Sequence, residues 1–137
     1  MKSIRKFNLL SENHFPGYLG VEIVDVADDG ITSRMPVRQE LMAPNGYLHA
    51  GSLVTLADTT AGYGCIHRLP VGASGFTTVE LKSNHLGTVT SGTVECVATP
   101  THLGRTTQVW DATIRSVETG KTLVLFRCTQ MVLYPKS

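Results

Sequence analysis

At 137 residues, with 42% hydrophobic and 17% charged residues, the chain has the size and composition of one folded domain over residues 1–137, which excludes a disordered protein. A formal net charge of +1 gives no electrostatic reason to expect nucleic acid or an anionic membrane as a partner. Three widely spaced cysteines, no signal-peptide pattern and no apolar run of membrane-spanning length predict reduced, buried thiols in a cytoplasmic protein.

The N-terminal third of the chain predicts a helix or arm followed by a hairpin. Residues 1–19 favour a short helix or an extended arm. Strand-like residues over 20–30 and 31–37 meet at the turn Asp28-Asp29-Gly30, which is typical of a β-hairpin. Residues 38–46 then form a connection that ends in a Pro-Asn-Gly turn.

The segment 47–70 is the only long helix candidate. Its apolar residues follow a helical spacing, and Pro70 ends the pattern. The segment carries little charge on any side, so we expect the helix to be buried nearly all round. Its small residues would let neighbouring strands approach closely: Ala57, Ala61, Gly62 and Gly64.

The remainder of the chain predicts strands alone. They cover residues 74–86, 91–103, 105–118 and 122–134, with glycine-containing turns between them. Two strands, one buried helix and four further strands predict an α+β domain. We expect a mostly antiparallel sheet wrapped around one long central helix.

The predicted helix start carries a pattern suited to acyl-transfer chemistry. Backbone N–H groups in the first turn of a helix have no partner within it, and the positive end of the helix dipole lies behind them. Ala50 and Gly51 are small enough to let a ligand approach these groups. A helix start of this kind can polarise a thioester carbonyl as an oxyanion hole does.

Asp58 is the second chemical component. A carboxylate within an apolar helix is costly to bury without a partner, and its environment can shift its pKa. Such a group suits a nucleophile or a general base, whereas its alternative is an ordinary helix residue paired with a base. His49 and Asn45 lie close to the helix start in sequence and could orient a substrate or a water molecule there.

The stretch PNGYLHAGSLVTLADTTAGYG resembles the hotdog-fold acyl-CoA thioesterase pattern, Gly-x-x-His-Gly-Gly followed by Leu-x-Asp or Leu-x-Glu. The predicted order of strands and helix extends this resemblance over nearly the whole chain, which resembles the PaaI-like (phenylacetate-pathway) branch of the family. The resemblance implies a hotdog fold and hydrolysis of acyl-CoA to free acid and coenzyme A. It also implies a homodimer or homotetramer and no cofactor or metal, coenzyme A being part of the substrate.

The resemblance implies roles for individual residues. Asp58 takes the position of the catalytic acid, as nucleophile or general base, and His49 that of the histidine beside the thioester. The backbone N–H of Ala50 takes the position of the carbonyl-polarising amide. Thr78 falls where members with a catalytic aspartate place a hydroxyl that positions water. Substrate contacts fall on Gly46, Gly51, Gly104 and Arg105, the last beside a coenzyme A phosphate.

This chain departs from the pattern at three positions. Ala50 replaces a glycine, which a backbone donor tolerates. The usual Asn or Gln six residues before the histidine is Ala43, so Asn45 is the candidate substitute. Gly62 stands where members with a catalytic glutamate carry a hydroxyl, which favours Thr78.

Two other functions stay open at this level. One is a non-hydrolytic acyl-CoA-binding or regulatory hotdog protein, and the other is an unrelated α+β ligand binder that would need no acid at position 58. The acyl group is also open. Tyr47, Phe76 and Trp110 allow an aryl or medium-chain group as well as a short one.

The spacing of the motif predicts that two chains share each active site. At roughly 100° and 1.5 Å per residue, Asp58 lies about half a turn around the helix and some 13 Å along it from His49. One straight helix cannot aim both at the same carbonyl. A two-fold dimer with antiparallel helices would bring the start of each helix to the middle of its partner.

Overall fold

The computed structural model describes residues 2–136 and confirms the expected order of elements. The N-terminal segment is helical, and the two strands, one long helix and four strands follow in sequence. The elements are α1 (Lys2–Ser11), α2 (Phe15–Leu19), β1 (Glu22–Ala27), β2 (Gly30–Pro36), the 3₁₀ helix η1 (Gln39–Leu41), α3 (Ala50–His67), β3 (Gly75–His85), β4 (Thr93–Leu103), β5 (Thr107–Ser116) and β6 (Thr122–Leu133).

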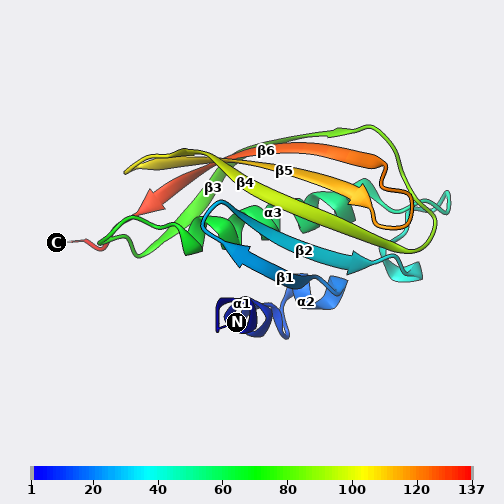
Figure 1. The fold of residues 1–137 in the computed structure, drawn as a ribbon, viewed down its shortest axis with the longest axis horizontal. Helices are drawn as coiled ribbons and strands as arrows, with labels where there is room; N and C mark the ends of the chain where they lie inside the picture. The colour runs from blue at the N-terminus through cyan, green and yellow to red at the C-terminus, as the bar shows by residue number, and fades with distance from the viewer. Residues whose placement is uncertain (1, 137) are drawn as a thin grey trace.

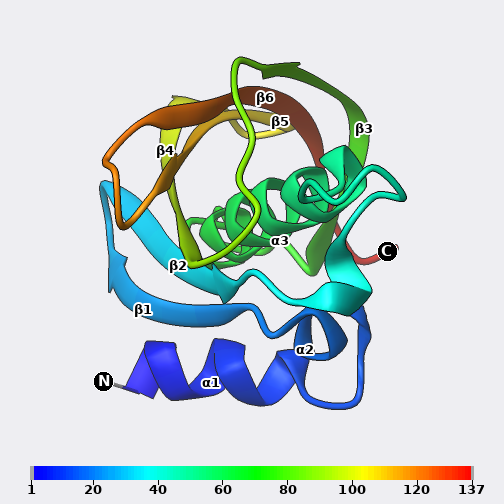
Figure 2. The same ribbon diagram turned by 90° about the vertical axis from the view of Figure 1, so that its right-hand side faces the viewer.

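The six strands form one sheet in the order β1-β2-β4-β5-β6-β3, and every neighbouring pair is antiparallel. The sheet curves around α3, which lies along its concave face (Figures 1 and 2). This is the α+β hotdog architecture expected from the sequence. Among the described residues, no helix is both long enough and apolar enough to cross a membrane.

The core lies between α3 and the concave face of the sheet. The helix approaches the sheet closely at small residues, as expected. A Cβ atom at Gly64 would lie 2.5 Å from Cζ3 of the buried Trp110, and one at Gly62 would lie 3.1 Å from Cζ of Phe76. Glycine at these two positions therefore lets the helix seat directly on two aromatic rings.

One side of α3 is open, so the expectation of a helix buried nearly all round is wrong for that side. Val54, Thr55, Asp58 and Thr59 are half-buried, and Gly51 is exposed. The reason is geometric, because a single curved sheet covers only one side of a helix. α3 therefore carries more apolar residues than a single chain buries.

The two edges of the sheet differ in what covers them. α1 lies beside β1, and the Asn8 side chain on α1 takes the place of a neighbouring strand: its Nδ2 donates to the Ile23 carbonyl at 3.1 Å and its Oδ1 accepts the Ile23 N–H at 2.8 Å. At the other edge β3 pairs with β6 alone, and its Val79 and Leu81 are 50% and 40% exposed. Unpaired apolar edges are prone to pair with another chain, so β3 is the edge available for association.

Candidate active site

The start of α3 is defined by His49, which caps it. The imidazole Nδ1 accepts the Gly51 N–H at 2.7 Å, and the His49 carbonyl accepts the N–H groups of Ser52 and Leu53 at 3.0 and 3.3 Å. The Ser52 hydroxyl donates to the Leu41 carbonyl at 2.8 Å and ties the first turn to the preceding loop. These bonds place the helix start at the surface in a defined orientation.

The Ala50 amide is the first-turn donor that takes part in none of these hydrogen bonds. Within residues 2–136 it has no hydrogen-bond acceptor, whereas the amides of the next three residues each have one. Ala50 is exposed, and its N–H lies at the positive end of the helix dipole. An oxygen that gains negative charge during a reaction would find a donor and a favourable field here.

The cap also determines the proton position on His49. Because Nδ1 accepts a backbone N–H, the neutral imidazole carries its proton on Nε2. The side chain is exposed, so Nε2–H is a second donor at the helix start. His49 thus holds the helix start through one nitrogen and presents a proton through the other.

Asp58 stands alone in the middle of α3. Its Oδ1 is buried and has no hydrogen-bond partner, and no Lys, Arg or His forms an ion pair with it in the described part of the chain. Among residues 2–136, therefore, the interpretation of Asp58 as the partner of a base fails. Burial raises the pKa of the Asp58 carboxyl above its ordinary value of 3.8, which makes the carboxylate a stronger base.

Thr78 lies on β3 beneath the same part of α3 as Asp58. Gly62 on α3 packs on Phe76 of β3, and the two elements run in opposite directions along the chain (Figure 1). One helical turn back from Gly62 leads to Asp58, about 6 Å along the axis. Two residues onward from Phe76 lead to Thr78, about 6.6 Å along the strand and on the same face of the sheet. The fold therefore brings Asp58 and Thr78 together.

The remaining predicted residues fall into two places. Asn45 and Gly46 form the exposed turn before the helix start, with the Asn45 Oδ1 accepting the Tyr47 N–H at 3.1 Å and Gly46 at φ 87°. Gly104 and Arg105 form the turn between β4 and β5, where the Arg105 guanidinium lies 5.8 Å from the centroid of the Tyr134 ring.

The Gly104-Arg105 turn lies near the far end of α3 from Ala50. Gln108, three residues beyond the turn, donates from Nε2 to the Arg68 carbonyl at the C-terminal cap of the helix at 3.0 Å. Since 18 residues span about 27 Å, Arg105 and Ala50 of one chain lie near opposite ends of α3. One chain therefore holds two separate groups, His49 with Ala50 and Asp58 with Thr78, and neither includes Arg105.

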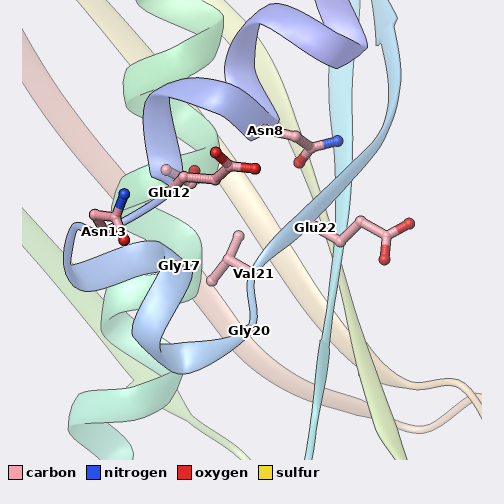
Figure 3. Close-up of a pocket in the computed structure, with 8 residues that line it drawn as sticks. Asn8, Glu12, Asn13, Gly17, Gly20, Val21 and Glu22 are labelled. Atoms are coloured by element: carbon pink, nitrogen blue, oxygen red, sulfur yellow. The ribbon is translucent and has the colours of Figure 1, made fainter.

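Among the surface hollows beside the N-terminal helices, two bear on where a substrate could bind. A groove of about 370 Å³ lies beside the start of α3, and its walls include His49, Gly51, Tyr18 and Leu41. A more open hollow of about 560 Å³ lies between α1, α2 and β1, lined by polar groups such as Asn8, Glu12 and Glu22 (Figure 3). None of the residues nominated from the sequence lines the second hollow, so the groove beside His49 is the better candidate for a substrate.

Sequence reasoning missed Gln130 on β6. It lies directly opposite Thr78, its side chain is 0% exposed, and neither polar atom of its amide has a hydrogen-bond partner in the described structure. The available signal was a polar residue at an inward-facing position of an alternating strand, between the buried Cys128 and Val132. Its register against Thr78 becomes visible only in the folded sheet.

Comparisons with known proteins agree with this fold. The Thioesterase superfamily profile matches residues 45–123, which include α3 and its start. The 1,4-dihydroxy-2-naphthoyl-CoA hydrolase of Escherichia coli is 31% identical over 134 residues, covering 96% of this chain and 95% of that protein. The enzyme of the same name from Listeria monocytogenes is 35% identical over 111 residues, covering 81% and 89%. The crystal structure of thioesterase HI1161 from Haemophilus influenzae superposes with a TM-score of 0.90 at 36% identity, covering 96% of this chain and 90% of that one.

Proposed function

Because this chain belongs to the thioesterase superfamily and is a thioester hydrolase, we propose that it cleaves acyl-CoA to free acid and coenzyme A with Asp58 and the Ala50 amide at the reaction centre. The observation that carries this assignment is the Ala50 N–H, the one first-turn amide without an acceptor among the described residues. It is supported by the unpartnered Oδ1 of Asp58. Membership of the PaaI-like branch stays a prediction.

The proposed reaction uses the helix start as an oxyanion hole. The thioester oxygen accepts a hydrogen bond from the Ala50 N–H, with His49 Nε2–H as a second donor, and both strengthen as charge develops on that oxygen. Asp58 accepts a proton from a water molecule whose oxygen attacks the carbonyl carbon. The C–S bond then breaks, and the leaving thiolate of coenzyme A takes the proton back from Asp58. Direct attack by Asp58, through an anhydride that water hydrolyses, is the alternative.

We propose that the two halves of the site meet across a dimer. In the described chain Asp58 is half a turn around α3 from His49, at the edge of the open side of the helix. Pairing of two β3 edges would extend the sheet and set two α3 helices side by side and antiparallel. Asp58 of one subunit would then meet the partner subunit's Ala50. Further association into a tetramer is part of the same expectation.

The same dimer would give Arg105 a place in the site. In one chain Arg105 lies near the C-terminal end of α3, remote from Ala50. In an antiparallel pair that end lies beyond the partner subunit's helix start. Arg105 is exposed and would be placed to bind a coenzyme A phosphate from across the interface. The backbone would approach the same substrate closely at three glycines, Gly46, Gly51 and Gly104. Asn45 would substitute for the Asn or Gln side chain that is absent at Ala43.

The groove beside His49 provides a test of substrate class. Its apolar walls include Phe15, Tyr18 and Leu41, so we expect aryl-CoA or medium-chain acyl-CoA to be hydrolysed with kcat/KM about tenfold or more above acetyl-CoA. The measurement is release of free thiol over a panel of the three thioester classes. Binding of coenzyme A thioesters without turnover would instead select the non-hydrolytic acyl-CoA-binding or regulatory alternative.

Thr78→Val tests whether the hydroxyl positions water. Valine keeps the shape of the side chain and the packing of the strand, so kcat should fall roughly tenfold to a hundredfold with KM little changed. Thr78→Ser, which keeps the hydroxyl, is the matched control and should have a mild effect. A folded Thr78→Val protein with wild-type kcat would remove Thr78 from the site.

A further inference from the structure

Gln130 presents a buried amide that the protein itself leaves without hydrogen bonds. The three buried side-chain atoms without partners in the described structure are Nε2 and Oε1 of Gln130 and Oδ1 of Asp58. Leaving such groups unpaired is unfavourable, and native proteins contain few of them. All three atoms therefore belong to two residues, one of which is the proposed catalytic acid.

The two residues face the same space between α3 and the sheet. Gln130 and Cys128 are two residues apart on β6 and both point to the buried face. Burial raises the pKa of the Cys128 thiol to about 12, and the negative charge of Asp58 adds to that rise. Thr78, directly opposite Gln130 in the β3–β6 register, lies beneath the same turn of α3. Counted from the Gly62–Phe76 contact, Asp58 and Thr78 lie near one another, and Gln130 is the cross-strand neighbour of Thr78.

The amide of Gln130 differs in its hydrogen bonding from the amide of a neighbouring buried glutamine. Gln108 lies directly opposite Gln130 on β5 and is equally buried. Its Oε1 accepts the Trp110 Nε1–H at 2.7 Å, and its Nε2 donates to the Arg68 carbonyl at 3.0 Å. Both polar atoms of the Gln108 amide are therefore satisfied within the fold, whereas those of Gln130 have no hydrogen-bond partner among the described residues.

We propose that Gln130 is a water-positioning residue, holding the attacking water between its amide and the Asp58 carboxylate; the assignment rests on the proposed hydrolase function. The water donates one proton to Asp58 Oδ1 and the other to Gln130 Oε1, which leaves a lone pair on its oxygen to attack the thioester carbon. During the attack the first proton passes to Asp58. In this arrangement Thr78, directly opposite Gln130 in the β3–β6 register, would donate its hydroxyl proton to the same water.

The experiment compares Gln130→Met with Gln108→Met. Methionine is close in volume to glutamine but offers no comparable hydrogen bonds, so Gln130→Met should lower kcat about tenfold or more, with KM within about twofold and a Tm equal to or above wild type. Gln108→Met leaves the Trp110 N–H and the Arg68 carbonyl unpaired, so its Tm should fall, while kcat of the folded fraction should stay within about twofold.

Two outcomes would overturn the proposal. Wild-type kcat in Gln130→Met would remove the amide from the reaction, and a loss of Tm or of folding comparable with Gln108→Met would assign it a structural role.

Gln130→Asn gives an independent measurement, because it keeps the amide but withdraws it by one methylene. It should also lower kcat about tenfold at an unchanged KM, and wild-type kcat in this variant would contradict the proposal. Absence of wild-type turnover with every thioester would instead refute the proposed hydrolase function itself.

Discussion

Asp58→Asn should reduce kcat by about a hundredfold or more while substrate still binds. Asparagine has nearly the same size and can form most of the same hydrogen bonds, but it can neither attack the carbonyl nor accept a proton from water. No ion pair holds Asp58 in the described chain, so the substitution leaves no basic partner unpaired. Steady-state kcat and KM on the preferred thioester, with Tm as the folding control, measure the effect. Near-normal kcat in a folded variant would rule out Asp58 as nucleophile and base.

The pH dependence of the wild-type enzyme is a second measurement on the same group. Burial raises the pKa of Asp58, and the reactive form is the carboxylate. Activity should therefore fall as the pH is lowered through a pKa above 3.8, and this acidic limb should be absent from the residual activity of Asp58→Asn. Stability depends on pH in the opposite direction. A carboxyl with a raised folded-state pKa binds its proton more tightly in the folded state than in the unfolded state. Its ionisation therefore lowers the free energy of unfolding as the pH rises through that pKa.

Mixing two inactive variants should restore about a quarter of wild-type activity. His49→Ser and Asp58→Asn damage opposite halves of the proposed shared site, and serine retains a side-chain acceptor for capping the helix. After joint unfolding and refolding at equal amounts, random pairing makes about half the dimers mixed. Each mixed dimer then holds one intact site and one doubly damaged site. Thiol release by the mixture, compared with each variant refolded alone, gives the result.

The matched control for this mixing experiment is Thr78→Val with Asp58→Asn. Both residues lie in the same half of the site, within one chain. Mixed dimers of this pair contain no intact site, so activity should not exceed the mean of the two separate variants. If His49→Ser and Asp58→Asn likewise failed to recover, with subunit exchange verified, each site would lie within a single chain.

Periodicity and turn chemistry predicted the order of elements because they act between residues that are close in sequence. Alternating side chains indicated the strands, Asp28-Asp29-Gly30 indicated the hairpin, and the helical spacing before Pro70 indicated α3. The helix-start donors and Asp58 could be nominated for the same reason, since both lie on one continuous segment. Their separation around and along that helix follows from helix geometry alone.

Tertiary structure decided which distant residues join these groups. Cross-strand register brought Gln130 on β6 opposite Thr78 on β3, and no local pattern encodes a pairing between residues 52 positions apart in the sequence. The Nδ1 bond of His49 to Gly51 depends on the orientation of the loop before α3. The sequence of α3 by itself determined an apolar helix with an acid at its centre. Only the curvature of one sheet, which covers one side of that helix, decided that Asp58 would lie at the boundary between the buried and the open side.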